Sequence, residues 1–392
     1  MLKALILLTC YIWFANGATQ CSVDLQRNFN KRSPLLLEQK GSTYSLQIPD
    51  GSKFRWRVGS GVLIGCSDAS NSISKVRDHS ARVSCVRNLE FTLRKKKYQF
   101  RQLECVSPVT SSIQSLKTSC GGGLGTLFNI GFEVKGLPFV KYFQSCYNVK
   151  DASAIYTEHE IFGRSIALAQ RSGDHSFKTG GIASKVRFSE EYLQVSQRER
   201  LEKLLGSTTE ANKYMSSTFL AKGHLTPDRD ALLDTWATAT YFYINAAPEW
   251  QVVNTGNWKR VENAARKKAE TLKDTIRVFT GVYDVLKLPD VNRTMVPITL
   301  TDRSQIPVPK WFWKILYHKK SDSAIAFVTL NNPFAATKEY LCKNICNMHG
   351  WDQQEYGDLS RGLTYCCTVK ELRSVIKSIP ASVNAKNVLK LR

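Results

Sequence analysis

The chain has 392 residues, of which 43% are hydrophobic and 22% charged; this is the composition of a globular protein and excludes a disordered chain or a collagen-like rod. At roughly 100–200 residues per domain, the length allows two domains. The 55 Lys and Arg against 33 Asp and Glu give a formal net charge of +22, so nucleic acids, sulfated glycans and anionic membranes are the candidate partners.

Residues 1–17 have the features of a secretory signal peptide. Lys3 precedes an apolar run over residues 4–14, and small residues follow at the spacing that signal peptidase recognises. A membrane-spanning helix needs about 20 apolar residues, and this run is too short for one. We therefore expect cleavage before Ala18 and a secreted, extracellular protein that makes no membrane contact.

Ten cysteines follow the signal peptide, in two groups. Six lie between Cys21 and Cys146 and four between Cys342 and Cys367. An even number in an oxidising compartment indicates up to five disulfides, whose pairing the sequence leaves open. The second group could also be considered as a zinc site, but only His349 lies at ligand spacing, so disulfides are favoured.

Residues 18–150 are expected to form a small, disulfide-bonded β module. Short runs of β-type residues alternate with turn sequences such as Pro49-Asp50-Gly51, and examples of these runs are residues 44–48, 54–58 and 62–64. No internal repeat and no low-complexity linker marks the boundary near residue 150.

One stretch of this module, Arg94-Lys95-Lys96-Lys97, combines cations with the aromatic residues that follow it. Such a stretch can contact phosphates and stack on bases. An edge strand that lysines protect from aggregation is an equally good interpretation. Both interpretations stay open at the level of sequence.

Residues 151–392 are expected to form one α/β or α+β domain. The segment 235–244 is rich in aromatic and β-branched residues and is predicted to be a buried strand ending at Asn245. After a loop, apolar residues recur at steps of three and four from Trp258 to Ile276, which predicts a helix with a core-facing stripe.

The most specific pattern lies between residues 222 and 266. It consists of Lys222-Gly223-His224, then Asn245, then Asn254-x-Gly256-x-Trp258, followed by Glu262 and Arg266. In these residues and their spacing, the chain resembles the DNA/RNA non-specific endonuclease family, whose signature is Arg-Gly-His, Asn, and Asn-x-Gly-x-Trp with a downstream Glu and Arg.

The resemblance covers most of residues 151–392. It implies an α+β fold, a ββα-metal nuclease domain with a central antiparallel sheet and helices. A cysteine-rich β module in front of this domain is similar to the arrangement in secreted arthropod members, including the salivary nucleic-acid-binding proteins of tsetse flies.

The resemblance also implies a role for each signature residue. His224 would be the general base that takes a proton from the attacking water. Asn254 would be the one direct protein ligand of a Mg²⁺ ion, or of Mn²⁺ in its place, and Glu262 would hold metal-bound water. Asn245 would position the histidine or the phosphate.

Several cations complete the expected site. Arg266 and Lys222 would stabilise the charge that develops on the pentacoordinate phosphorus. Arg171 is a loose match to an upstream arginine of the family. Lys267 and Lys268, together with residues 94–97, are further candidates for contact with nucleic acid.

Each of these residues has an ordinary interpretation when taken alone. His224 could be a surface or core histidine, and Asn254 could cap a helix. Glu262 and Arg266 could be an i,i+4 ion pair of a few tenths of a kcal/mol. The joint spacing of all of them favours the nuclease.

Two positions depart from the family. Lys222 stands where relatives carry Arg, and an ammonium is a point charge, whereas a guanidinium grips two phosphate oxygens. Glu249 stands where relatives often carry Gln and is expected to bring a negative charge near the phosphate. Both changes weaken transition-state stabilisation more than ground-state attraction, so we expect strong binding and slow cleavage.

Three functions remain open. The first is a secreted, Mg²⁺-dependent nuclease that acts on single- or double-stranded DNA and RNA without sequence preference, with reduced activity or, as an alternative, the full activity of a digestive or salivary nuclease. The second is a non-catalytic, high-affinity nucleic-acid binder, which the charge of +21 left after removal of Lys3 favours. The third, a glycan-binding module, leaves the pattern at 222–266 unexplained.

Overall fold

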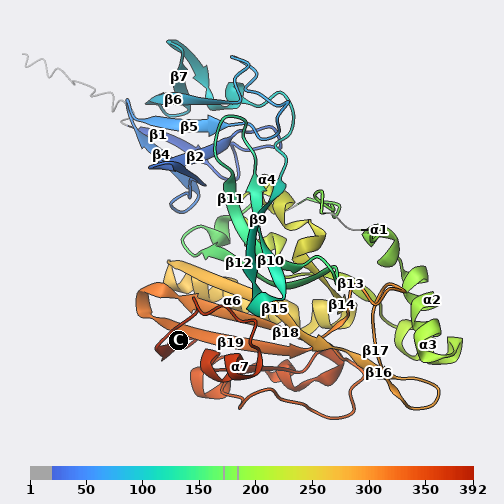
Figure 1. Ribbon diagram of the computed structural model, residues 1–392. Helices are drawn as coiled ribbons and strands as arrows, with labels where there is room; N and C mark the ends of the chain where they lie inside the picture. The colour runs from blue at the N-terminus through green and yellow to red at the C-terminus, as the bar shows by residue number, and fades with distance from the viewer. Residues whose placement is uncertain (1–19, 171–172, 183–184) are drawn as a thin grey trace, which may run out of the picture.

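The computed structural model describes residues 20–170, 173–182 and 185–392 (Figure 1). The expected signal peptide lies outside these residues. Within the described ranges, no helix is both long and apolar enough to cross a membrane.

The N-terminal part is the expected β module. Its strands are short: β1 (Gln20–Asp24), β2 (Leu35–Lys40), β3 (Thr43–Leu46), β4 (Lys53–Arg57), β5 (Gly61–Gly65), β6 (Ser80–Arg87), β7 (Glu90–Leu93) and β8 (Lys96–Gln99). Strands β1 and β4 pair with each other, and the others follow the order β3-β2-β5-β6-β7-β8. Aromatic side chains such as Phe54 and Phe91 fill the interior, which is why so many short strands hold together.

The basic stretch at 94–97 forms the tip and last strand of this module. Arg94 and Lys95 have φ of 49° and 65° and connect β7 to β8 as a two-residue turn. β8 is the last strand in the sheet order, so the basic stretch lies on an edge strand, as the second interpretation predicts. A nucleic-acid contact by the exposed lysines is compatible with this position.

A large antiparallel sheet forms the centre of the rest of the chain. Its strands run in the order β20-β19-β18-β15-β12-β11, and β10 and β9 continue from β11. The bounds are β9 (Ser112–Cys120), β10 (Gly125–Phe132), β11 (Val140–Asn148), β12 (Ser153–Phe162), β15 (Thr275–Val285), β18 (Pro309–His318), β19 (Ser323–Leu330) and β20 (Thr364–Cys367). One parallel pairing, Lys141 with Ser45, joins this sheet to the N-terminal module.

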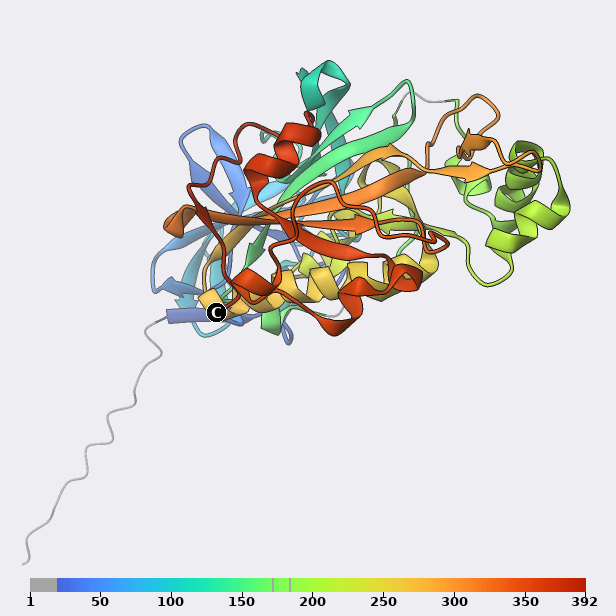
Figure 2. The same cartoon turned by 90° about the horizontal axis from the view of Figure 1, so that it is seen from below.

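Helices cover both faces of the sheet, as Figure 2 shows for α6 (Lys259–Leu272) and α7 (Val369–Val375) on opposite sides. Every residue of β19 is buried. Ile325 and Phe327 pack in the cluster that contains α6, whereas Ala326 and Val328 pack in the cluster that contains α7. Alternating side chains thus give the sheet two cores, one on each face.

The remaining elements lie around this sheet. They are α1 (Phe188–Glu191), α2 (Gln194–Leu205), α3 (Thr208–Met215), α4 (Asp234–Ala237), α5 (Gln251–Val253), β13 (Leu220–His224), β14 (Ala246–Trp250), β16 (Lys287–Pro289), β17 (Met295–Pro297) and β21 (Asn387–Val388). The α+β class with a central antiparallel sheet is therefore confirmed. The division into domains at residue 150 stays a prediction.

The predicted strand at 235–244 is wrong. These residues form α4 and two short 3₁₀ turns, Thr238–Thr240 and Tyr243–Asn245. The hydroxyls of Thr238 and Thr240 donate to the carbonyls three residues earlier, at Thr235 and Ala237. Threonine hydroxyls can satisfy the carbonyls of a helical turn in this way, which offsets the preference of threonine for strands.

The predicted helix from Trp258 to Ile276 is shorter than expected. It ends at Leu272, because Lys273 takes a left-handed conformation with φ of 49°. Ile276 belongs to β15, where it is buried on the same face as the helix. Ile276 and the apolar side chains of α6 pack in the same core, which explains why Ile276 extends the apolar pattern of the helix in the sequence.

All ten cysteines that follow the expected signal peptide form disulfides. The pairs are Cys21–Cys85, Cys66–Cys105, Cys120–Cys146, Cys342–Cys367 and Cys346–Cys366. The expectation of two separately crosslinked groups, and of disulfides in place of zinc, is confirmed.

We expect the double substitution Cys120→Ser and Cys146→Ser to lower the free energy of unfolding. The disulfide closes a loop with a sequence separation of 26, for which chain entropy gives about 3 to 4 kcal/mol. Chemical unfolding of the two proteins measures this difference. A loss below about 1 kcal/mol would show that the disulfide adds little to the constraint that the β9-β10-β11 pairing already provides.

Candidate active site

The signature residues lie on a ββα unit. Strands β13 and β14 pair antiparallel, with His224 opposite Ala246 and Lys222 opposite Pro248. The chain then enters the helical segment of α5, the π-helical turn η7 (Asn254–Trp258) and α6. Since side chains alternate along a strand, Lys222 and His224 project from the same face of β13.

Gly223, between these two residues, is required by close packing. A Cβ atom at this position would lie 2.4 Å from Oε2 of Glu249 and 3.1 Å from the backbone oxygen of Ala247. Any larger residue would therefore separate β13 from β14 and displace His224.

The ring of His224 is held by aromatic neighbours. Its centroid lies 4.8 Å from that of Phe177 and 4.8 Å from that of Tyr241. Nε2 is buried and has no hydrogen-bond partner among the described residues. Burial lowers the pKa of His224 to about 4, although Asp228 opposes the shift. At neutral pH the imidazole is uncharged and has a lone pair to accept a proton.

Lys222 lies among aromatic rings. Its Nζ atom is 5.7 Å from the ring centroid of Phe177, 5.8 Å from that of Tyr192 and 5.9 Å from that of Tyr243. Burial lowers its pKa below the ordinary lysine value. Cation–π attraction holds the ammonium in place, and no carboxylate of the described chain neutralises it.

Arg266 and Glu262 do not form the ion pair that their spacing allowed. Nη1 of Arg266 instead donates to Asp230 Oδ1 at 2.8 Å, and Nη2 donates to Asn263 Oδ1 at 2.7 Å. The carboxylate of Glu262 has no hydrogen-bond partner in the described ranges. Burial raises its pKa to about 7, against the opposing effects of Lys314 and Arg266.

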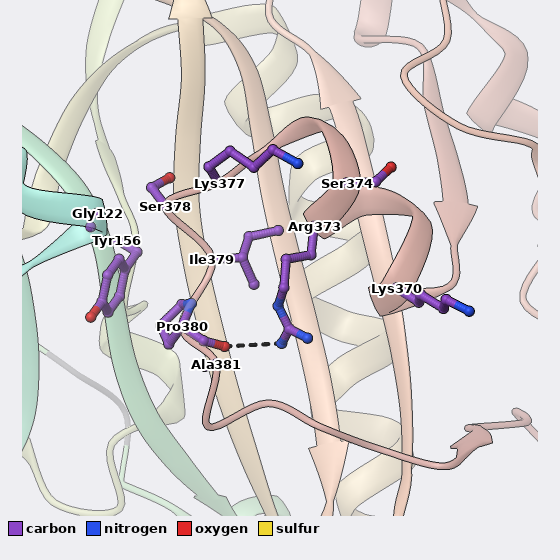
Figure 3. A pocket seen from close by; sticks show the side chains of 11 residues that line it. Gly122, Tyr156, Lys370, Arg373, Ser374, Lys377, Ser378, Ile379, Pro380 and Ala381 are labelled. Carbon is purple, nitrogen blue, oxygen red and sulfur yellow. Dashed lines mark hydrogen bonds between the residues drawn. The ribbon is translucent and has the colours of Figure 1, made fainter.

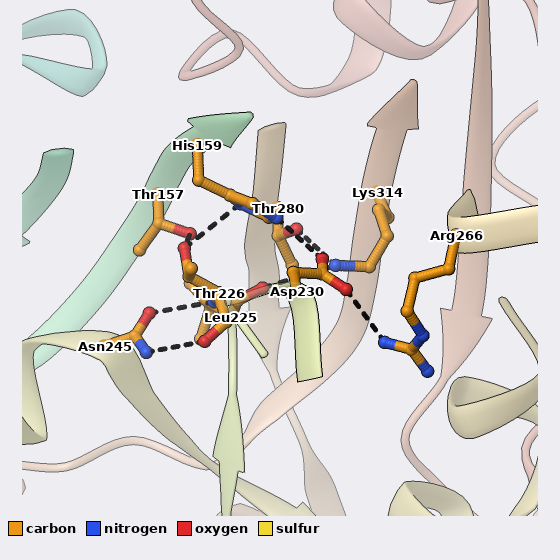
Figure 4. Close-up of polar contacts among 9 residues, drawn as sticks. All are labelled: Thr157, His159, Leu225, Thr226, Asp230, Asn245, Arg266, Thr280 and Lys314. Atoms are coloured by element: carbon orange, nitrogen blue, oxygen red, sulfur yellow. Dashed lines mark hydrogen bonds and ion pairs between the residues drawn. The ribbon is translucent and has the colours of Figure 1, made fainter. Parts of the chain in front are cut away.

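Asn245 is fully buried and bonded to the backbone (Figure 4). Its Nδ2 donates to the carbonyls of Thr226 and Thr240, and its Oδ1 accepts from the Thr226 amide. The Leu225 amide also donates to the Asn245 carbonyl at 2.9 Å. Since these bonds fix the turn after His224, the geometry fits positioning of the histidine and not contact with a phosphate.

Asn254 opens η7 and is half-buried. It has helical dihedral angles and makes no capping bond, so the interpretation as a helix cap does not hold. Its Nδ2 donates to Gln251 Oε1 at 3.4 Å, which leaves Oδ1 without a partner in the part of the chain that the structure describes. The carboxamide oxygen of Asn254 and the carboxylate of Glu262, eight residues later on α6, are oxygen donors of the kind that Mg²⁺ prefers, so their chemistry fits the ion.

Sequence reasoning missed a buried polar network under the signature residues (Figure 4). Asp230 Oδ2 lies 2.8 Å from Nε2 of His159, on β12, and Oδ1 accepts the bond from Arg266. Burial opposes ionisation of Asp230, but the His159 bond and the Arg266 charge hold its pKa at about 2. The carboxylate is thus charged inside the protein and connects the sheet to α6.

Lys314, on β18, belongs to the same network. It is 1% exposed, and its Nζ donates to Thr280 Oγ1 at 2.6 Å and to the Leu225 carbonyl at 3.3 Å. Nζ also lies 5.0 Å from the ring centroid of Trp258. A single lysine inside the apolar run 311–316 was the sequence signal that could have revealed it.

Glu249 differs from its expected state. It is fully buried, and both side-chain oxygens lack hydrogen-bond partners in the described residues. Burial, with a contribution from Glu262, raises its pKa well above the ordinary value. Because an isolated buried carboxylate is costly, burial favours the uncharged acid at Glu249 over the negative charge that was expected near the phosphate.

The further cations fall in different places. Lys267 is exposed and lies 3.0 Å from a carboxylate oxygen of Glu270. Lys268 is buried and its Nζ donates to the Leu391 carbonyl at 3.1 Å, which does not fit contact with nucleic acid. Arg171 lies outside the described residues.

We expect Asp230→Asn to lower the free energy of unfolding at neutral pH by about 3 kcal/mol, because it leaves the buried charge of Arg266 unpaired. The folded pKa of Asp230 is depressed, so its stabilisation is complete above about pH 4 and is lost as the pH falls through about 2. The difference between variant and wild type should therefore shrink over this range.

Chemical unfolding at a series of pH values measures the effect of Asp230→Asn. Asp78→Asn is the control, because Asp78 is 40% exposed and pairs at the surface with Arg94, which is 63% exposed. A surface pair of this kind contributes less than about 1 kcal/mol. A pH-independent loss in Asp230→Asn would contradict the ionised state of Asp230.

Comparison with known proteins agrees with this geometry. The model of the DNA/RNA non-specific endonuclease family matches residues 124–372. A salivary endonuclease of Lutzomyia longipalpis is 30% identical over 95% of this chain and 88% of its own length. Salivary protein Tsal2A of Glossina morsitans morsitans is 26% identical over 95% of each chain, and a salivary endonuclease of Culex quinquefasciatus is 25% identical over 90% of this chain and 88% of its own. With its ββα unit and signature residues, the chain belongs to the DNA/RNA non-specific endonuclease family.

Proposed function

We propose that this protein is a secreted, salivary nucleic-acid-binding nuclease. It binds DNA and RNA without sequence preference and hydrolyses their phosphodiester bonds with Mg²⁺, at a rate that Lys222 reduces. The observation that carries this proposal is the half-buried, uncharged His224, whose buried Nε2 has no partner among the described residues. The five disulfides support secretion.

His224 acts as the general base in this proposal. Nε2 accepts a proton from the water that attacks the phosphorus, and the aromatic contacts to Phe177 and Tyr241 keep the ring oriented. Asn245 holds the turn that follows His224. Proton acceptance needs an uncharged ring, which the low pKa of His224 supplies at neutral pH.

Asn254 and Glu262 are the residues that would hold Mg²⁺, directly and through water. A bound Mg²⁺ would polarise a phosphoryl oxygen and offset developing negative charge. Arg266 is kept in place by Asp230 and Asn263 and adds positive charge near the reacting group. Lys222 adds a further positive charge, but as a point charge without the two-pronged grip of arginine.

The environment of Lys222 favours a second candidate, a binder without catalysis. Three aromatic rings hold its ammonium in one position. The ammonium can therefore attract a phosphate but cannot move with the phosphate oxygens as they shift in the transition state. The net charge of +22 supplies strong, salt-sensitive attraction whether or not cleavage follows.

We expect His224→Ala to lower Mg²⁺-dependent cleavage of plasmid and RNA by at least about 100-fold, because general-base catalysis contributes at least that factor. Gel electrophoresis with Mg²⁺ or with EDTA measures cleavage, and a gel-shift assay measures binding. His79→Ala, in the N-terminal module, is the control. Wild-type protein that retards intact nucleic acid in Mg²⁺ would favour the non-catalytic binder.

We expect Lys222→Arg to raise the cleavage rate about tenfold, the equivalent of one additional charged hydrogen bond of about 1.5 kcal/mol in the transition state. The affinity for uncut nucleic acid should stay nearly constant, because the charge is unchanged. Single-turnover cleavage and fluorescence anisotropy separate the two effects. An equal or lower rate would contradict the role given to Lys222.

A further inference from the structure

A second cationic site lies on the opposite face of the central sheet. There, a cavity of about 630 Å³ opens between α7, the segment that follows it, and the turn at Gly121 and Gly122. Figure 3 shows this cavity in front of the strands, with helix α6 behind them. Leu372 of α7 and Val261 of α6 belong to different core clusters, which places the cavity and the catalytic helix on different faces.

Three cations line the cavity without a counter-charge. Lys370, Arg373 and Lys377 are all part of the wall, and no Asp or Glu is. None of the three forms an ion pair within the described residues. The nearest acid in sequence, Glu371, accepts a hydrogen bond from Thr368 Oγ1 at 3.0 Å at the start of α7. Cations gathered in this way repel one another, and an anion in the cavity would relieve the repulsion.

Arg373 is fixed in the wall. Its Nη2 donates to the carbonyl of Pro380 at 3.0 Å and also to that of Val383. Nε is buried without a partner and is out of reach of a ligand, whereas Nη1 makes no hydrogen bond to any described residue and is not buried. The guanidinium is thus anchored through Nη2 and keeps Nη1 as a donor for an acceptor in the cavity.

The lining of the cavity combines several hydrogen-bond donors. Lys370 and Lys377 are exposed and Arg373 is half-buried, and together they border a volume of the size found in pockets that hold small-molecule ligands. Ser378 adds a hydroxyl, and the buried Tyr156 of β12 forms part of the wall. Guanidinium, ammonium and hydroxyl donors suit the phosphate groups of a nucleic acid.

We propose that this cavity is a second nucleic-acid contact, which binds phosphate groups of a single strand on the sheet face opposite His224. This inference rests on the proposed function, because it assigns part of the basic charge of the protein to a second contact with the same nucleic acid. A polynucleotide is favoured over a free nucleotide, since the net charge of +22 attracts a polyanion over its whole length.

The test compares two triple variants that lose the same charge. The cavity variant carries Lys370→Gln, Arg373→Gln and Lys377→Gln. The control carries Lys287→Gln, Lys319→Gln and Lys320→Gln, at exposed lysines that form no ion pair with a described residue. Both are made in the His224→Ala background with EDTA, so that the nucleic acid stays intact, and anisotropy of a fluorescent single strand is measured over a range of salt.

We expect the cavity variant to bind at least about tenfold more weakly at physiological salt, with a slope of log K against log salt that is less steep by about 2, since each lost phosphate contact on a single strand removes about 0.7. The control should change far less. The double variant Lys370→Gln and Lys377→Gln keeps the Arg373 contacts and should lose an intermediate part of the affinity. A melting temperature equal to that of the wild type verifies that this variant is folded.

Three results would overturn the inference. Equal losses in the two triple variants would show that only total charge matters. If the cavity variant bound heparin more weakly but DNA as well as before, the cavity would be assigned to sulfated glycans. If the cavity variant lost affinity only for a mononucleotide, the cavity would be assigned to free nucleotides. If the wild-type protein bound no nucleic acid at all, the proposed function would fail together with this inference. In the other outcomes the wild-type protein still binds nucleic acid, and only the inference about the cavity fails.

Discussion

The buried carboxylate of Asp230 joins the central sheet to the helix that carries the signature residues. It lies between His159 of β12 and Arg266 of α6, and it is ionised although almost no water reaches it. A buried charge of this kind is tolerated only while its partners stay in place. The position of α6, and with it the positions of Glu262 and Arg266, therefore depends on this interaction.

The electrostatics of the site combine groups whose charged forms burial disfavours with fixed cations. Burial lowers the pKa of His224 to about 4, so its ring is uncharged at pH 7, and burial raises the pKa of Glu249 well above its ordinary value. Lys222 and Arg266 stay positive, the first between aromatic rings and the second against Asp230. The site can therefore attract a phosphate and still offer an uncharged imidazole to accept a proton.

The central sheet separates the two proposed sites. On one face, α6 carries Glu262 and Arg266 of the family signature; on the other, α7 and the chain after it border a cavity with three cations that form no ion pair within the described residues. Disulfides crosslink the regions on the second side, since Cys120–Cys146 lies beside the Gly121 turn and Cys342–Cys367 beside β20. The chain thus holds both faces in a fixed relation to the same strands.

The sequence alone determined the family, the ββα signature, the two cysteine groups and the positive charge. These properties depend on residue identity and spacing, which local geometry converts into structure in a regular way. The path of residues 235–244 was different, because a buried aromatic and β-branched segment can form a strand or helical turns, and only its packing decides.

Tertiary structure also decided which acidic and basic side chains are ionised and which of them form ion pairs. The raised pKa of Glu249, the pairing of Arg266 with Asp230 in place of Glu262, and the burial of Lys268 all depend on side chains that approach from distant parts of the chain. Desolvation and long-range contacts set these properties, and neither is encoded in the spacing of residues along a sequence.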